Sequence, residues 1–141
     1  MSETNQLLAE EPLIRTDGTI FSRETFSRPW SLLMSGRIHE ATIGNLSDLL
    51  SKGRPVIVDF WANWCSPCHA MTPIMRKLSK EFGQQVIFVK VDVANNRDLA
   101  TQFNVRSLPT FILFRNGKEW DRLTRAKSLK ELRQVLEKLA T

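Results

Sequence analysis

The two cysteines of the chain, Cys65 and Cys68, carry its most reactive side chains and are separated only by Ser66 and Pro67. They stand where an apolar, β-branched run gives way to a helical pattern, so Cys65 is expected at the start of a helix. Free backbone N–H groups and the positive end of the helix dipole stabilise a thiolate there and lower the pKa of Cys65, the predicted nucleophile. Cys68, one turn further on and predicted to be the less exposed thiol, can attack a mixed disulfide on Cys65.

The two residues between the cysteines are predicted to tune this exchange. Pro67 in the first turn of a helix costs no backbone hydrogen bond and stiffens the loop. The hydroxyl of Ser66 is expected to reach nearby amides and to adjust the redox potential.

Three other interpretations of the cysteine pair compete with exchange chemistry. The segment Cys65 to His69 matches the C-x-x-C-H pattern of covalent haem attachment, which usually takes place outside the cytoplasm. A structural zinc site requires four ligands, and only His39 and His69 could supplement the two cysteines as ligands. A purely structural disulfide would close a very short loop and gain little loop entropy. A redox role is favoured over all three, and no bound metal is expected.

Asp59 is the one charged residue in the apolar run Pro55 to Trp61, six residues before Cys65. A buried carboxylate is costly unless it is paired or neutralised, so we expect a raised pKa and a role as general base for Cys68. Lys90 holds the analogous position in the next apolar run and is predicted to face Asp59 as its charge partner. Exposure of either side chain at a strand end or sheet edge is the structural alternative.

From Ile38 onward, strand-like and helix-like segments alternate in the manner of an α/β domain with a central sheet. The first 36 residues lack this alternation. The predicted order is β, α, β, α, β, α, β, β, α, with strands at 38–43, 55–61, 86–93, 110–114 and 118–123 and helices at 46–50, 66–82, 96–103 and 129–139.

Helix-capping residues mark the starts of three of these helices. Asn45 and either Asn95 or Asn96 are predicted N-caps, and Ser128 with Glu131 forms a capping box.

Other signals concern turns and prolines. Asn116-Gly117 predicts a type I′ hairpin, and Pro73 is expected to kink the long helix. Pro109 directly precedes a strand, where proline is unexpected, so it marks either a sheet edge or a cis peptide bond.

The chain has 141 residues and a net charge of +5, which fits one domain with or without a tail. Residues 1–36 carry a net charge of −2, so the remainder is strongly basic. Its basic residues recur singly along the sequence, which disfavours nucleic acid and favours acidic proteins as partners.

No stretch approaches the roughly 20 apolar residues that span a bilayer, and the acidic start is unlike a secretory leader. We therefore expect a cytoplasmic protein, and in the cytoplasm a cysteine pair is more often catalytic or metal-binding than structural.

Several motifs together resemble the thioredoxin family: Asp59 to Cys68, Lys90 to Asp92, Leu108 to Phe111, and Asn116-Gly117. The resemblance covers residues 37–141 and implies a thioredoxin fold, with a mixed five-stranded sheet in the order 1-3-2-4-5 flanked by four helices. Residues 1–36 form an extension of unknown role. The chain looks closest to a longer bacterial thioredoxin whose N-terminal segment binds zinc, but it lacks that segment's cysteines.

The resemblance also implies roles for individual residues. Cys65 would be the attacking thiol, Cys68 the resolving thiol and Asp59 the buried acid. Pro109 would be a cis-proline beside the cysteines, and Leu108 would offer backbone groups to an extended substrate. Trp61 and Trp64 would pack around the site. The redox disulfide would serve without any cofactor, and an NADPH-dependent flavoprotein, thioredoxin reductase, would recycle it.

Three substitutions depart from the family pattern. Ser66 replaces the usual glycine between the cysteines, and His69 replaces the usual Lys or Arg after them, where it could tune the thiolate near neutral pH. Arg125 stands where the family normally has glycine in the substrate-facing loop, and adds bulk and charge there.

The sequence as a whole predicts a monomeric protein-disulfide reductase of the cytoplasm, acting on disulfide-containing proteins and on neither nucleic acid nor membranes. Two alternatives stay open: a redox-independent interaction or chaperone-like module, and a redox relay or oxidant with one dedicated partner. The apolar residues of the extension suggest that it packs on the domain, binds a partner or lies on a membrane surface. These residues are Phe21, Phe26, Trp30, Leu32, Leu33 and Met34.

Overall fold

The computed structural model describes residues 36–141, so the predictions for the N-terminal extension lie outside the described residues. All nine predicted elements of the rest are present, in the predicted order. The strands are β1 (Ile38–Glu40), β2 (Val56–Trp61), β3 (Ile87–Asp92), β4 (Thr110–Arg115) and β5 (Lys118–Thr124), and the helices are α3 (Leu46–Leu50), α4 (Ser66–Phe82), α5 (Arg97–Gln102) and α6 (Leu129–Ala140).

The five strands form one sheet in the order β1-β3-β2-β4-β5, as predicted. β1, β3 and β2 run parallel, whereas β4 is antiparallel to β2 and β5 is antiparallel to β4. β2 is therefore an inner strand, and its burial on both faces explains why the sequence from Val56 to Phe60 is almost entirely apolar.

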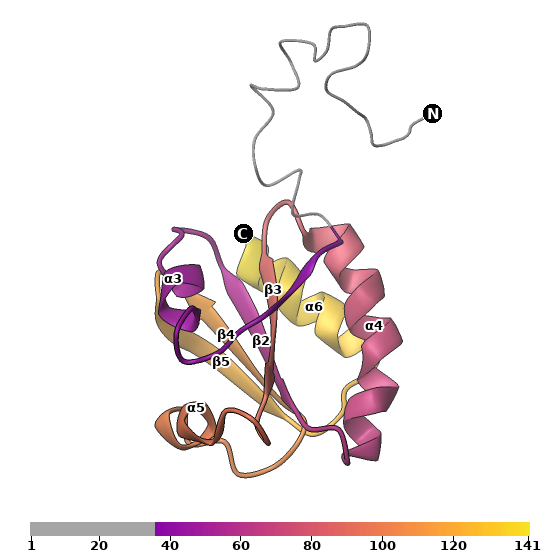
Figure 1. The fold of residues 1–141 in the computed structure, drawn as a ribbon. Coiled ribbons are helices and arrows are strands. Elements are labelled where there is room, and N and C mark those ends of the chain that lie inside the picture. Colours follow the sequence, from indigo (N-terminus) through magenta and orange to yellow (C-terminus); the bar gives the residue numbers. More distant parts are fainter. Residues whose placement is uncertain (1–35) are drawn as a thin grey trace, which may run out of the picture. The chain divides into compact units, whose positions relative to one another are not determined.

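Helices cover both faces of the sheet, with α4 and α6 on one side and α3 and α5 on the other (Figure 1). Successive residues of a strand point to opposite faces, so β2 contributes to both layers. Val58 and Phe60 pack in the cluster that includes α3 and α5, and Ile57 packs with α4 and α6. The same alternation places Asp59 on the side of α4.

Three local predictions need correction. β1 ends at Glu40 instead of continuing to residue 43, because the chain turns there and the Thr42 N–H donates to Asn45 Oδ1 at 2.8 Å. Asn45 and Asn96 do precede α3 and α5, but neither side chain caps its helix. Asn45 accepts from Thr42 instead, and Asn96 donates to the carbonyl of Asp92 at 3.0 Å.

The capping box and the hairpin are confirmed. The hydroxyl of Ser128 accepts from the Glu131 N–H, and the Glu131 carboxylate accepts from the Ser128 N–H. Asn116 and Gly117 have φ values of 55° and 77°, as a type I′ turn requires. The hairpin pairs Thr110 at the start of β4 with Thr124 at the end of β5.

Candidate active site

Four segments that are distant in sequence converge at one edge of the sheet. The parallel strands β2 and β3 both end there, with Trp61 opposite Asp92. β4 begins and β5 ends at the same edge, because Thr110 pairs with both Phe60 and Thr124. The loop with the cysteines, the turn after β3, the loop with Pro109 and the segment after β5 are thereby brought together.

Cys65 and Cys68 form a disulfide, with their Cα atoms 5.3 Å apart. Cys65 is the N-cap residue of α4, and Pro67 lies in the first turn. The Cys68 N–H donates to Cys65 Sγ at 3.2 Å, so the sulfur of Cys65 faces one of the free amides at the start of α4. A thiolate at this atom would receive the same hydrogen bond together with the attraction of the helix dipole.

Both cysteines are buried, with relative exposures of 5% for Cys65 and 4% for Cys68. The expected difference in exposure is therefore absent in the disulfide. Ala62 completes the buried cluster, and the half-buried residues around it come from three segments: Trp61, Val93 and Leu108. The packing of Trp61 at the site agrees with the prediction. The contribution of Val93 was missed, although its place directly after β3 could have indicated it.

Asp59 is 3% exposed in the middle of β2, and its Oδ1 has no hydrogen-bond partner among the described residues. Burial raises the pKa of Asp59 to about 7, and the charge of Lys90 partly offsets this shift. The carboxyl group therefore exchanges its proton near neutral pH.

Lys90 pairs with Asp59 in the register of β2 and β3, so the two side chains share a face of the sheet. The Lys90 ammonium group also lies over an aromatic ring: Nζ is 4.3 Å from the centroid of Trp61. Lys90 thus acts on Asp59 through the electric field, without an ion pair, and packs against the tryptophan that covers the cysteines.

The peptide bond between Leu108 and Pro109 is cis, which resolves the two alternatives for this proline. The Thr110 hydroxyl donates to the Ser107 carbonyl at 2.6 Å, and the Arg125 N–H donates to the Pro109 carbonyl at 2.9 Å. Leu108 packs against the cysteine cluster. This loop is therefore tied to the segment after β5 while it contacts the disulfide.

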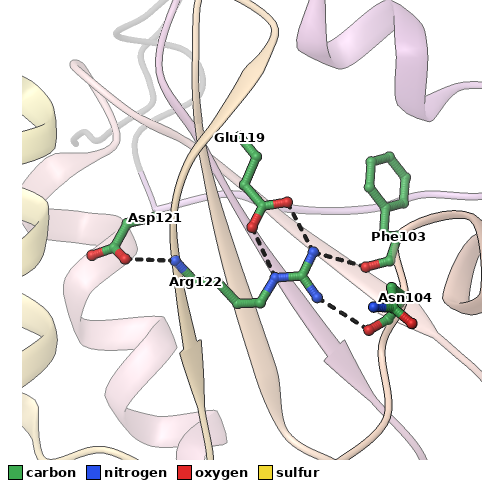
Figure 2. Close-up of polar contacts among 5 residues, drawn as sticks. All are labelled: Phe103, Asn104, Glu119, Asp121 and Arg122. Carbon is green, nitrogen blue, oxygen red and sulfur yellow. Dashed lines mark hydrogen bonds and ion pairs between the residues drawn. The ribbon is translucent and has the colours of Figure 1, made fainter.

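Arg122 ties the other end of the same loop to β5 (Figure 2). Its guanidinium group makes two hydrogen bonds to the Glu119 carboxylate, each of 2.8 Å. It also donates to the carbonyls of Phe103 at 2.8 Å and Asn104 at 3.1 Å, at the end of α5. Two free carbonyls at a helix end are satisfied in this way, and the start of the Pro109 loop is fixed to the sheet.

The remaining predicted site residues lie on the surface beside the disulfide. Trp64 is 73% exposed, which leaves a large aromatic ring open to a partner. The His69 ring shares a hydrogen bond of 2.6 Å with the Asn63 carbonyl and lies edge-on to Trp61. The Ser66 hydroxyl makes no hydrogen bond to any residue within 36–141, so the predicted contact with amides is absent from this arrangement.

The site offers no metal centre within the described part of the chain, because no group of three or more possible ligands gathers there. His39 lies on β1, where burial, followed by the charges of Arg37 and Lys52, lowers its pKa. No helix in residues 36–141 is long and apolar enough to cross a bilayer.

Sequence comparison supports this arrangement. The thioredoxin family model matches residues 38–138. Thioredoxin C-2 of Corynebacterium nephridii is 42% identical over 86 residues, which cover 60% of this chain and 80% of that protein. The chloroplastic thioredoxin Y of rice, Oryza sativa, is 38% identical over 97 residues, 68% of this chain and 58% of that protein. The bifunctional thioredoxin reductase/thioredoxin of Mycobacterium leprae is 39% identical over 97 residues, 66% of this chain and 21% of that protein.

The fold leads to the same conclusion. The solved structure of a thioredoxin variant from Halobacterium salinarum superposes with a TM-score of 0.71 at 26% identity, covering 76% of this chain and 94% of that structure. Members of the family exchange dithiols and disulfides with proteins, need no cofactor and are reduced by thioredoxin reductase. The chain therefore belongs to the thioredoxin family, and it is a thiol-disulfide oxidoreductase whose redox-active pair is Cys65 and Cys68.

Proposed function

We propose that this chain reduces disulfides in other proteins, with Cys65 as the attacking thiol. The Cys65 thiolate attacks one sulfur of a substrate disulfide, so that a mixed disulfide forms and the other substrate sulfur leaves as a thiolate. Cys68 then attacks Cys65 Sγ, which releases the second substrate sulfur and restores the Cys65–Cys68 disulfide. The observation that carries this proposal is the Cys68 N–H aimed at Cys65 Sγ at the start of α4.

Asp59 is the proposed proton acceptor for Cys68. The resolving thiol must lose its proton before it attacks, and a base works best when its pKa lies near the working pH. The pKa of about 7 that burial gives Asp59 meets this requirement. Lys90 adjusts the same equilibrium, because its positive charge favours the ionised carboxylate.

Substrate is proposed to bind along Trp64, Leu108 and Pro109. Trp64 offers an exposed aromatic surface, and the loop of Leu108 and Pro109 contacts the cysteine cluster. Such a loop can hydrogen-bond an extended segment of a partner through its backbone groups. Ser66, Pro67 and His69 surround the sulfurs and are proposed to adjust their reactivity.

The catalytic cycle is closed by an NADPH-dependent thioredoxin reductase, which returns the Cys65–Cys68 disulfide to the dithiol. One relative is a bifunctional thioredoxin reductase/thioredoxin, which supports this partner. We place the protein in the cytoplasm as a monomer and a contributor to redox homeostasis and electron transport, since a disulfide reductase suits a compartment that keeps thiols reduced. Residues 37–141 form the proposed catalytic domain, and residues 1–36 an extension.

Trapping the mixed disulfide tests this proposal. In Cys68→Ala the second attack is removed, so substrates should stay attached to Cys65 when the reduced variant is incubated with a cell extract. The adducts should appear on non-reducing gels, and dithiothreitol should release them. The matched control is the Cys65→Ser/Cys68→Ala double variant, in which no thiol can attack. Equal adduct formation by both variants, or none by Cys68→Ala, would contradict the proposal, and a single adduct would favour a dedicated relay.

A further inference from the structure

The loops around the disulfide carry positive charge without any carboxylate of their own. Residues 62–69, 103–109 and 124–128 contain no Asp or Glu. They contribute three basic residues at the edge of the sheet where the cysteines lie: Arg106, Arg125 and Lys127. The remaining loop at this edge follows Asp92, whose carboxylate already accepts from the Ala94 N–H at 3.0 Å and from the Asn95 side chain at 2.7 Å.

Arg125 differs from the other two because its backbone is strained. Its φ of 77° lies in the left-handed region, where an L-residue meets a steric penalty that glycine avoids. The Arg125 N–H donates to the Pro109 carbonyl at 2.9 Å, so the strained residue is attached to the substrate-binding loop. Strained backbone held in place at a binding loop is a signature of function.

The Arg125 guanidinium group is also uncompensated. Arg125 is exposed, and within residues 36–141 it forms no ion pair, in contrast to Arg122 with Glu119 and Arg133 with Glu81. Arg106, in the same loop as Pro109, donates to the Asn104 side chain, which is neutral. A partner carboxylate that approaches the disulfide therefore meets an unpaired cation.

We propose that Arg125 is a specificity-determining residue, which selects disulfides whose flanking residues are acidic. This inference rests on the proposed reductase function. An Asp or Glu beside the attacked cysteine would pair with the guanidinium group while the substrate lies along Leu108 and Pro109. Charge at the rim of an interface acts mainly on the rate of association, so acidic substrates should show a higher kcat/KM that falls as ionic strength rises.

The test compares two synthetic peptides that share one disulfide loop and differ in having Asp or Asn at the flanking positions. The reduced protein should reduce the Asp peptide about three- to fivefold faster than the Asn peptide in kcat/KM at low salt. Arg125→Gln should lose most of this preference, because its kcat/KM should fall more for the Asp peptide than for the Asn peptide, and Arg125→Lys should retain part of the preference. Lys118→Gln is the matched control, because it removes the same charge at the opposite end of β5.

Arg125→Gly separates recognition from structure. Glycine removes both the charge and the backbone strain, so this variant should have a higher Tm than wild type and still lose the preference for the Asp peptide. A preference that survives Arg125→Gln, or that falls equally in Lys118→Gln, would overturn the inference while leaving the reductase function intact. If wild type reduces neither peptide, the proposed function fails and the inference fails with it.

Discussion

Cys65→Ser is expected to lower the rate of insulin reduction by more than about a thousandfold, to the level of dithiothreitol alone. A serine hydroxyl is protonated at neutral pH and cannot form a disulfide, so neither exchange step can begin. The amide of Cys68 that faces Cys65 Sγ would then have no thiolate to stabilise. The rate is followed by the turbidity of the released insulin chains.

The matched control is Ser66→Ala, which removes a hydroxyl next to Cys65 and leaves both sulfurs in place. Because the Ser66 hydroxyl has no hydrogen-bond partner within residues 36–141, this variant should fold normally. Any change that it causes in the rate should be small beside the loss in Cys65→Ser, because both sulfurs remain. Circular dichroism should show that Cys65→Ser folds as well. Full activity in folded Cys65→Ser would contradict the assignment of the nucleophile.

Asp59→Asn is expected to make the folded protein more stable at about pH 8, by roughly 2 to 4 kcal/mol in the free energy of unfolding. The pKa of Asp59 is about 7 in the fold but 3.8 as a free group. Between these two values the unfolded chain gives up this proton and the folded chain keeps it, so wild-type stability falls as pH rises through this window. Asparagine has no proton to lose and avoids this penalty. The difference should nearly vanish below about pH 3, where the carboxyl group is neutral in both states.

Urea unfolding of the oxidised proteins at several pH values measures this difference, since other titrating groups cancel between the two variants. Asp48→Asn is the control: Asp48 is an exposed carboxylate on α3, and its replacement should change stability little at any pH. Asp59→Asn should also slow turnover by roughly tenfold or more, because the resolving thiol loses its base. A stability difference that does not depend on pH would show that Asp59 is not buried as an ionisable group.

The order of elements was predictable because each strand and helix has a clear apolar period. The two buried strands, β2 and β3, appear in the sequence as nearly continuous apolar runs. The capping box and the Asn116-Gly117 turn could be predicted because each depends on only a few neighbouring residues. The position of the cysteine pair was predictable as well. The spacing of apolar residues changes from a strand pattern to a helix pattern at Cys65, which is the N-cap residue of α4.

Some contacts could not be predicted from the sequence, because they depend on the register of paired strands and on how elements distant in sequence pack together. The hydrogen bonds of Arg122 to the carbonyls of Phe103 and Asn104 depend on how the end of α5 lies against β5. The position of Lys90 over the ring of Trp61 depends likewise on the pairing of β2 with β3.

The predictions that Asn45 and Asn96 cap their helices were wrong for a local reason. Asn45 and Asn96 found partners in the preceding turn, and such partners compete with the first amides of a helix.

Both exchange steps depend on Cys65 being held as a thiolate at the start of α4, so titration of this thiol is the decisive measurement. In the reduced protein, the rate of alkylation of Cys65 by iodoacetamide, measured against pH with mass spectrometric assignment, reports the thiolate fraction. We expect Cys65 to react as a thiolate at neutral pH, with a midpoint clearly below that of a free thiol. A Cys65 midpoint at about 8.5 or higher, as for an unperturbed cysteine, would contradict it.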